Sequence, residues 1–393
     1  MTAIETASAH APSPDERAPA PTVPSEISNP VNGRILAVSE DRIAGFVNEP
    51  FAQIAFCADL PEEIVIERLR AMLSSGVIRR IRQTLMATNL APGALVAWRV
   101  SSDKLDSAFS YMVNDDPFSG HVVIRSTDAE TPGSVYRLWT TLKVPQRYSM
   151  TRHCAFLASK VGAEAYRIMP AKKLFALGVG HLRRRTIEPG ARSEESGRVL
   201  DTNIVELSPL EWRVLTALKR EFTIDEITPS PWRLRAEEAG IPLDEFIRVA
   251  RSLSAREVIG RFSTFLEHVK PSAAGERVTR YNALFHWRVP TGREIEAGRE
   301  VGRHHILTHA YWREGGPEFA NVNIMAVAHG TDKQLVLEHK AAIDNHLDEA
   351  GIPILYTNVF WGGRSEIKPS AISPVEYEAW SNRVGLPREA SAG

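Results

Sequence analysis

Two His–Arg pairs with the same spacing occur in separate parts of the chain. His121 and Arg125 lie in the segment HVVIR, and His309 and Arg313 lie in HAYWR. Side chains at positions i and i+4 of an extended strand emerge from the same face, about 13 Å apart. An arginine binds a carboxylate through two parallel hydrogen bonds, and a histidine can deliver a proton near neutral pH. Each pair therefore predicts a sheet face suited to binding and protonating a polyanion.

Further candidate binding residues lie in the strands predicted around these pairs. Lys143 and His329 occupy equivalent positions in the two halves of the sequence, and Trp139 shares a strand with Lys143. The second half adds more polar side chains, namely His286, His304, His305, Tyr311 and Asn323. A single strand histidine is more often structural than catalytic, but the repetition of the pair favours a functional role. We expect the chemistry in the second half.

Several other kinds of site find no support in the sequence. His304 and His305 have no cysteine or carboxylate at a zinc or iron ligand spacing, so we expect no protein-held metal. Cys57 and Cys154 form no CxxC motif, which gives neither a disulfide framework nor a zinc site. The chain has no GxSxG motif, no Walker A motif and no GxGxxG after a predicted strand.

The two pairs recur because the chain is internally repeated. GALVAWRV at 93–100 matches NALFHWRV at 282–289, and LPEEIVIERLRAMLSSGVIRRI at 60–81 aligns without a gap with IPLDEFIRVARSLSAREVIGRF at 241–262. The second match has apolar residues at helical spacing followed by a short strand. Upstream of each lies another helical pattern, for which Ser39 and Ser208 are the expected N-caps.

Each half is predicted to be a winged helix-turn-helix domain followed by a ferredoxin-like domain. Helix, turn, helix and strand indicate the first, and the order strand-helix-strand-strand-helix-strand (βαββαβ) indicates the second. The fold class is therefore α+β, as a tandem duplication. The expected units are a disordered tail at 1–33, winged helices at 34–90 and 188–270 (the latter with a linker), ferredoxin-like domains at 91–187 and 271–363, and an extension at 364–393.

Bulk properties fit an ordinary globular protein of two or more domains. The 393 residues carry a net charge of −1, so no global positive field attracts nucleic acid or membrane surfaces. The Ala/Pro/Ser-rich start has no apolar core of a signal peptide, and no apolar run approaches the ~20 residues of a membrane span. We expect a cytoplasmic protein in which the two halves pair as a pseudo-dimer, with homodimerisation left open.

DNA binding is the main alternative suggested by the winged helices. Their candidate recognition helices are acidic in the first turn, where carboxylates face phosphate repulsion. Two basic patches remain, one on the first wing and one after the first ferredoxin-like domain; we interpret the former as a solvated face. Their members are Arg79, Arg80 and Arg82, and Lys172, Lys173 and Arg183 to Arg185.

The winged helix closing in VIRRI, followed by a ferredoxin-like domain, resembles the Lrp/AsnC regulators. PEEIVIERLRAMLSSGVIRRI, THAYWRE, VNIMAVAHG and GAEAYRIMPAKKLFALGV are similar to its enzymatic branch, the siroheme decarboxylases of haem d1 and alternative haem biosynthesis. The resemblance covers roughly residues 34–362 and suggests the fused, two-unit form. It implies removal of carbon dioxide from two siroheme acetates, giving didecarboxysiroheme, with an iron tetrapyrrole as substrate and no organic cofactor.

The resemblance also implies roles for particular residues. His309 and Arg313, with Tyr311 between them, match the family's His and Arg, as do His121 and Arg125; Asn323 matches a family Asn. The first half departs from the pattern by having three aliphatic residues between its His and Arg. Two alternatives therefore stay open: an Lrp/AsnC-type regulator, and a tetrapyrrole-binding protein without turnover.

Overall fold

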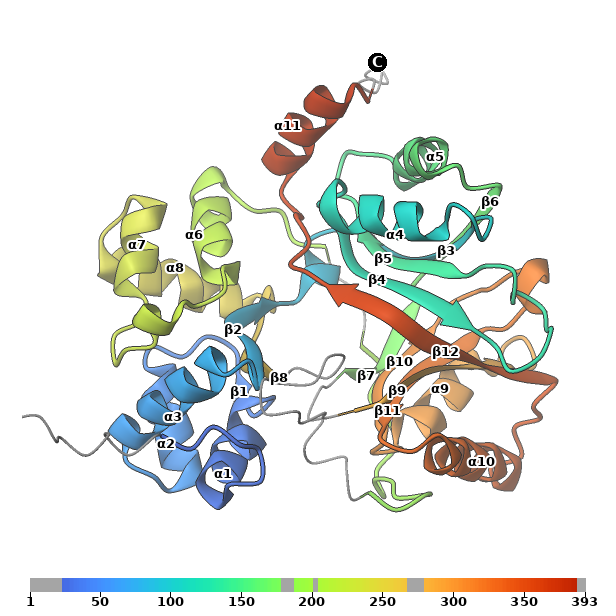
Figure 1. Cartoon of the computed structure of the whole chain (residues 1–393), viewed down its shortest axis with the longest axis horizontal. Helices are drawn as coiled ribbons and strands as arrows, with labels where there is room; N and C mark the ends of the chain where they lie inside the picture. Colours follow the sequence, from blue (N-terminus) through green and yellow to red (C-terminus); the bar gives the residue numbers. More distant parts are fainter. Residues whose placement is uncertain (1–22, 178–186, 201–203, 267–278, 387–393) are drawn as a thin grey trace, which may run out of the picture.

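The computed structural model describes residues 23–177, 187–200, 204–266 and 279–386. Within these ranges the fold consists of paired winged helices on one side and paired ferredoxin-like domains on the other (Figure 1). Both ferredoxin-like domains follow the order predicted from the sequence, whereas in the described residues each winged helix contains three helices where two were predicted. None of the helices in the described ranges is long and apolar enough to span a membrane.

The two winged helices share one small sheet. The first contains α1 (Pro30–Ser39), β1 (Ile43–Ala44), α2 (Pro50–Ala58), α3 (Glu62–Ser74) and β2 (Ile78–Leu85); the second contains α6 (Pro209–Lys219), α7 (Arg233–Ala239), α8 (Leu243–Ala255) and β8 (Ile259–Leu266). The sheet order is β1-β8-β2, so β8 of the second unit lies between the two strands of the first. One hydrophobic core runs through both units.

The helix boundaries of these units correct two predictions. Ser208 is an N-cap as expected, and forms a capping box with Glu211. Ser39 is instead the last residue of α1, because the helix begins upstream at Pro30, capped by Asn29. Helix α1 therefore starts inside the stretch assigned to the N-terminal tail.

The first wing is turned inward rather than into solvent. Arg80 is 7% exposed, donates to the Ile367 carbonyl at 2.7 Å and pairs with Glu221 at 2.9 Å. Arg79 and Arg82 are half-buried. The interpretation of this patch as a solvated face is wrong, because β2 pairs along its length with β8. In the second basic patch, Lys172 pairs with Glu314, and Arg183 to Arg185 lie outside the described residues.

The ferredoxin-like domains join into one nine-stranded sheet. The first contains β3 (Gly93–Arg99), α4 (Leu105–Asn114), β4 (Ser119–Ser126), β5 (Leu138–Lys143), α5 (Met150–Val161) and β6 (Ala165–Pro170); the second contains β9 (Tyr281–Arg288), α9 (Glu294–Gly302), β10 (Leu307–Trp312), β11 (Ile324–Gly330), α10 (Lys333–Glu349) and β12 (Tyr356–Ile367). The sheet order is β6-β3-β5-β4-β12-β9-β11-β10-β7. Antiparallel pairing of β4 with β12 links the two domains, and β7 (Lys173–Leu177) adds to the edge strand β10.

The two halves of this sheet face each other across a shared core. Trp139 of the first half packs edge-on against Phe360 of the second, with ring centroids 5.2 Å apart. Ala97 and Val123 on one side, with Leu284 and Met325 on the other, complete the contact. The outer faces are covered by α4 and α5 in one half and by α9 and α10 in the other (Figure 1). The faces turned away from the helices therefore meet as in a two-layer sandwich.

The last helix, α11 (Pro374–Val384), returns to the first ferredoxin-like domain. Tyr377 and Trp380 pack on Phe118, and the Trp380 ring stacks on His153 at 4.9 Å. His153 also contacts the fully buried Asp116, with 3.3 Å between imidazole nitrogen and carboxylate.

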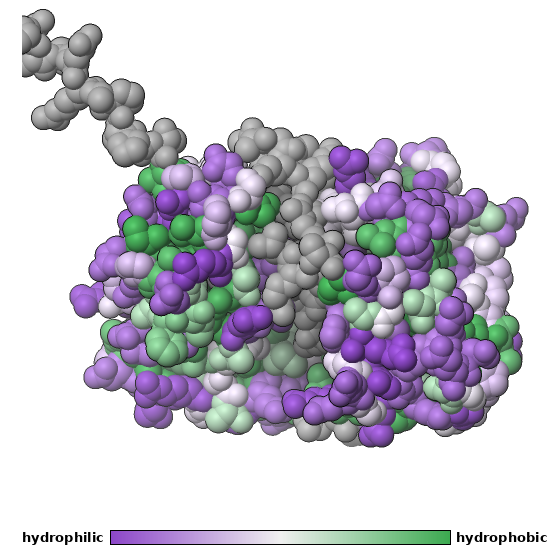
Figure 2. All heavy atoms as spheres, turned by 90° about the horizontal axis from the view of Figure 1, so that it is seen from below, coloured by the Kyte–Doolittle hydropathy of each residue, from purple (hydrophilic) through white to green (hydrophobic). Residues whose placement is uncertain are grey.

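On the molecular face seen in Figure 2, hydrophobic side chains are scattered among hydrophilic ones on both sides of the molecule.

Candidate functional site

The His–Arg pair of the second half lies on the sheet face that meets the other domain. The rings of His309 and Tyr311 are stacked, with centroids 6.0 Å apart and planes 12° apart. The Arg313 guanidinium lies 4.5 Å above the Tyr311 ring and donates to the Met169 carbonyl in the facing half of the nine-stranded sheet. The face between the two halves of this sheet is called the inter-sheet face below. Burial raises the pKa of Tyr311, with Arg313 acting against it, so the phenol stays protonated at neutral pH. As the alternation of side chains along a strand predicts, His309, Tyr311 and Arg313 lie in one row on the same face.

Two more cations approach this row from other domains. Lys143, at the end of β5, has its pKa lowered to about 8 by burial, then by Arg313 and by Arg82. Arg82 comes from β2 of the first winged helix, and its own pKa is lowered to about 10, chiefly by burial. No carboxylate of the described residues offsets the positive charge at Lys143. Sequence analysis missed Arg82 as a site residue because only the tertiary packing brings the wing to this sheet.

The first-half arginine begins a hydrogen-bonded chain into the second half. Arg125 is 4% exposed; its Nη1 donates to the Asn282 side chain at 3.2 Å and to the Phe360 carbonyl at 3.3 Å. Asn282 in turn lies 3.2 Å from Nε2 of His329. Burial alone lowers the pKa of Arg125 to about 9, without a carboxylate among its described neighbours. Asn282 belongs to the repeat segment NALFHWRV, but its position beside Arg125 required the pairing of β4 with β12.

His121 and Arg125 do not reproduce the arrangement of His309 and Arg313. His121 lies 2.8 Å from the Ser365 hydroxyl of β12, while Arg125 is held by Asn282. Between them the strand pairing with β12 is irregular, because the register shifts between Gly362 and Ser365. The two first-half residues thus lie along the seam between the domains.

Three predicted binding residues are structural in their surroundings. Trp139 is fully buried and donates to the Tyr136 carbonyl at 2.6 Å. Asn323 bonds both backbone groups of Val289 and the Glu294 carboxylate, which ties β11 to the start of α9. His286 is 1% exposed, and burial followed by Arg125 lowers its pKa to about 3, so the imidazole is neutral at physiological pH.

The remaining histidines of the second half lie away from this face. His304 is buried and its Nε2 lies 2.9 Å from Nδ1 of His346 on α10, while His305 is exposed beside Ser193. In the described ranges no three His, Cys, Asp or Glu side chains gather as a metal site would require.

The arrangement as a whole suits a ligand with several carboxylates. Lys143, Arg125 and Arg313 are buried or half-buried cations, and the groups that shift their pKa values include no carboxylate of the described chain. A buried charge without a counter-charge is costly in a protein interior. An anionic ligand between the sheets would supply that counter-charge, with His309 and Tyr311 beside it as proton donors.

Comparison with known proteins identifies a matching domain family and two curated relatives, both siroheme decarboxylase subunits. The AsnC-like ligand binding domain family model matches residues 91–176 and 279–360, which lie in the two ferredoxin-like units. The siroheme decarboxylase NirDL subunit of Paracoccus pantotrophus is 24% identical over 289 residues, 74% of this chain and 82% of the relative. The siroheme decarboxylase alpha subunit of Desulfovibrio desulfuricans is 29% identical over 131 residues, 33% of this chain and 70% of the relative.

Two solved structures share the architecture over almost their whole length. The crystal structure of the siroheme decarboxylase NirDL matches with a TM-score of 0.62 and 18% identity, covering 90% of this chain and 98% of the other. The structure of NirDL in complex with an iron-uroporphyrin III analogue matches with a TM-score of 0.61 and 19% identity, covering 91% and 100%. The resemblance stated from the sequence is confirmed, and so is the predicted fold.

Proposed function

We propose that this protein is a decarboxylase that removes carbon dioxide from the acetate side chains of siroheme. The observation that carries the proposal is the set of cations at the inter-sheet face, Lys143, Arg125 and Arg313, for which the described chain provides no carboxylate. Siroheme carries many carboxylates, and binding it would neutralise this charge. The curated relatives with this fold are siroheme decarboxylases, which supports the same substrate class.

The reaction needs a held carboxylate and a proton. In each acetate the bond between the methylene carbon and the carboxylate breaks, carbon dioxide leaves, and the electron pair remains on the methylene carbon. A proton then completes a methyl group. The apolar surroundings provided by Leu284, Met325 and Phe360 favour the neutral product over the charged carboxylate.

The residues divide between binding and proton transfer. Arg313, Lys143 and Arg125 hold carboxylates at separate points of the inter-sheet face. His309 delivers the proton, oriented by its stacking on Tyr311 and by a 3.1 Å contact between its Nδ1 and the Thr308 hydroxyl. His286 is excluded as a cationic acid because its pKa is about 3.

A regulator of transcription fits the winged helices less well. Both recognition helices begin with two carboxylates, Glu62 and Glu63 in α3 and Asp244 and Glu245 in α8. The first wing pairs with the second in one sheet, and Arg80 is buried in that junction. These features oppose the approach of phosphate groups.

The test is anaerobic incubation of the purified protein with siroheme, followed by mass spectrometry and absorption spectroscopy. We expect stepwise loss of two carbon dioxide units, slowed about 10²–10⁴-fold in His309→Ala. His305→Ala is the matched control and retains the wild-type rate, because His305 is exposed on the same domain away from the inter-sheet face. Tight binding with unchanged substrate mass would make the protein a non-catalytic binder. No binding would overturn the tetrapyrrole proposal.

A further inference from the structure

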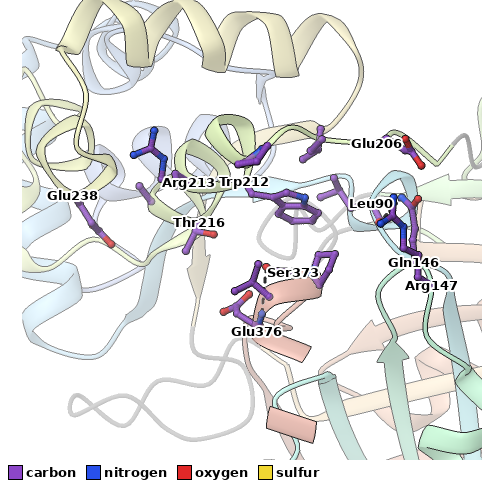
Figure 3. A pocket seen from close by; sticks show the side chains of 15 residues that line it. Leu90, Gln146, Arg147, Glu206, Trp212, Arg213, Thr216, Glu238, Ser373 and Glu376 are labelled. Atoms are coloured by element: carbon purple, nitrogen blue, oxygen red, sulfur yellow. Dashed lines mark hydrogen bonds between the residues drawn. The ribbon is translucent and has the colours of Figure 1, made fainter. Parts of the chain in front are cut away.

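A cavity of about 650 Å³ lies where three parts of the chain meet, apart from the residues proposed for decarboxylation. One wall is α6 of the second winged helix, another is the start of α11, and the third is the segment after β5 (Figure 3). Its size is within the range of small-molecule sites in proteins, ~300–1,000 Å³. The residues assigned to the decarboxylation site are absent from its lining.

The cavity has an apolar middle. Trp212 lies at its centre (Figure 3), and Leu90, Leu207, Pro374 and Val375 are among the other lining side chains. Val375 is 72% exposed, which leaves apolar surface open to a ligand. An aromatic body stacking on the Trp212 indole would bury this surface.

Two arginines lie at the ends of this apolar surface. Figure 3 shows Arg147 beyond one side of Trp212 and Arg213 beyond the other. Within the described ranges neither guanidinium has an ion-pair or hydrogen-bond partner, and both side chains are exposed. Arg147 has a φ of 74°, a left-handed conformation that is strained for a residue other than glycine. A strained residue that presents an unpaired cation to a cavity indicates a binding role.

Most of the acidic lining residues are already neutralised. Glu376 pairs with Lys219 at 3.0 Å, and Glu238 pairs with Arg220 at 2.9 Å. Glu206 is exposed, and its carboxylate points away from Trp212 in Figure 3. The charges left to recognise a ligand along the apolar middle are therefore those of the arginines.

We propose that this cavity is a second ligand site, which binds a flat amphipathic organic anion with carboxylates at one or both ends. The aromatic body lies on Trp212, and Arg147 and Arg213 bind the carboxylates. The site is independent of the decarboxylation proposal, because it uses none of the same residues. Its ligand contacts the second winged helix, α11 and the first ferredoxin-like domain together.

The experiment uses calorimetric titration of the whole protein with naphthalene-2,6-dicarboxylate, naphthalene-2-carboxylate and naphthalene-2-carboxamide. We expect one site per chain and affinities falling in that order, with at least a fivefold loss from monocarboxylate to amide. Arg147→Gln and Arg213→Gln each lower the affinity for the dicarboxylate at least fivefold, and Trp212→Leu lowers the affinity for all three probes. Arg248→Gln is the matched control, since Arg248 is an exposed arginine of α8 that does not line the cavity.

Several results would overturn the proposal. Equal binding of carboxylate and carboxamide would show that charge is not recognised, and equal binding by the two cavity arginine variants and the wild type would place the probe elsewhere. Absence of binding by all three probes would refute the site. Circular dichroism melting of each variant shows whether a lost affinity reflects the site or a failure to fold.

Discussion

At the scale of single residues, the buried cations proposed to bind siroheme lower the stability of the unliganded protein. Lys143 is charged in the unfolded chain up to its ordinary pKa of 10.5, but only to about 8 in the folded protein. Between these values the unfolded state binds more protons, so stability without ligand rises with pH through this window. Below pH 8, approximately the Lys143 pKa in the folded protein, the buried protonated lysine lowers the free energy of unfolding. A carboxylate of the ligand bound beside it would remove this penalty and so strengthen binding.

Replacing Lys143 by Met should therefore have opposite effects on folding and on binding. We expect a higher melting temperature than wild type at pH 7, a difference that shrinks towards pH 10, and about tenfold weaker siroheme binding. Thermal melts at both pH values and a siroheme titration monitored by absorption give the answer. If Lys143→Met melted at a lower temperature than wild type at pH 7, the buried charge of Lys143 would not be destabilising.

In the wild-type protein, siroheme affinity should fall as pH rises through about 8, because Lys143 loses its proton there. The measurement is a series of absorption titrations between about pH 6.5 and 9.5, on both sides of the Lys143 pKa. The Lys143→Met variant serves as control and should show a flatter dependence. The same slope in both proteins would assign the titration to another group.

Substitution of the buried, neutral His286 should leave the reaction rate unchanged, whereas substitution of His309, which stacks on Tyr311, should lower it. His286→Leu keeps the volume and removes a polar group whose Nε2 has no hydrogen-bond partner among the described residues, so we expect unchanged or higher stability and a pH–rate profile like wild type. His309→Gln should lower the rate about 10²-fold or more while leaving siroheme affinity within about threefold. Loss of activity in His286→Leu with intact folding would move the proton donor to His286.

Part of the site followed from local sequence, and part did not. Strand alternation predicted that His309 and Arg313 share a face, and the stack through Tyr311 has this geometry. Alternation does not tell which face is buried by another sheet, so Trp139 and His286 were predicted as binding residues although they lie in the core. Arg82 and Asn282 join the cluster through contacts between domains, which no local pattern encodes.

At the scale of secondary structure elements, α11 is held by a buried polar network. Burial by itself raises the pKa of the Asp116 carboxyl, but hydrogen bonds involving His153, Ser119 and the Phe118 amide lower it overall. His153 contacts the Tyr377 hydroxyl at 3.1 Å. Because the Asp116 pKa lies below its unfolded value, the network stabilises the fold above about pH 4 and is lost in acid.

Truncating the α11 anchor should release the helix without unfolding the chain. Trp380→Ala removes a side chain that stacks on His153 and is 2% exposed, at a cost of about 3–5 kcal/mol of local stability. We expect faster proteolytic cleavage near residue 370 and faster hydrogen exchange of α11. Val375→Ala, on the exposed side of the same helix, is the control and should leave cleavage unchanged. Identical cleavage in both variants would show that other contacts hold α11.

The order of helices and strands in the ferredoxin-like domains was predictable from periodicity and from the repeat, but the third helix of each winged helix was not predicted. The start of α1 was not, since its N-cap Asn29 and the adjacent Pro30 lay in a stretch resembling a disordered tail. The strand β7 also escaped prediction, because it follows β6 after two residues and pairs with β10 of the other domain. Its partner strand is more than a hundred residues away in the sequence.

At the scale of the whole molecule, we propose that the winged helices serve as a structural platform rather than as DNA readers. The two wings pair with each other through β2 and β8, and Arg80 of the first wing is buried. We expect only weak DNA binding, with the same affinity for unrelated duplexes, in fluorescence anisotropy at about 50–200 mM salt. Tight binding of one DNA sequence over others would contradict the platform role and would favour a transcriptional regulator instead.

The insertion of β8 between β1 and β2 has a consequence for biosynthesis. The first winged helix cannot complete its sheet until the chain is synthesised through residue 266, about 180 residues after β2 ends. At ~5–20 residues per second this takes roughly 10–40 s. During that time the nascent chain exposes strand edges and apolar side chains that invite aggregation. We therefore expect the ribosome-bound first half to need protection by chaperones, and separate expression of the halves to yield an N-terminal fragment with an open sheet.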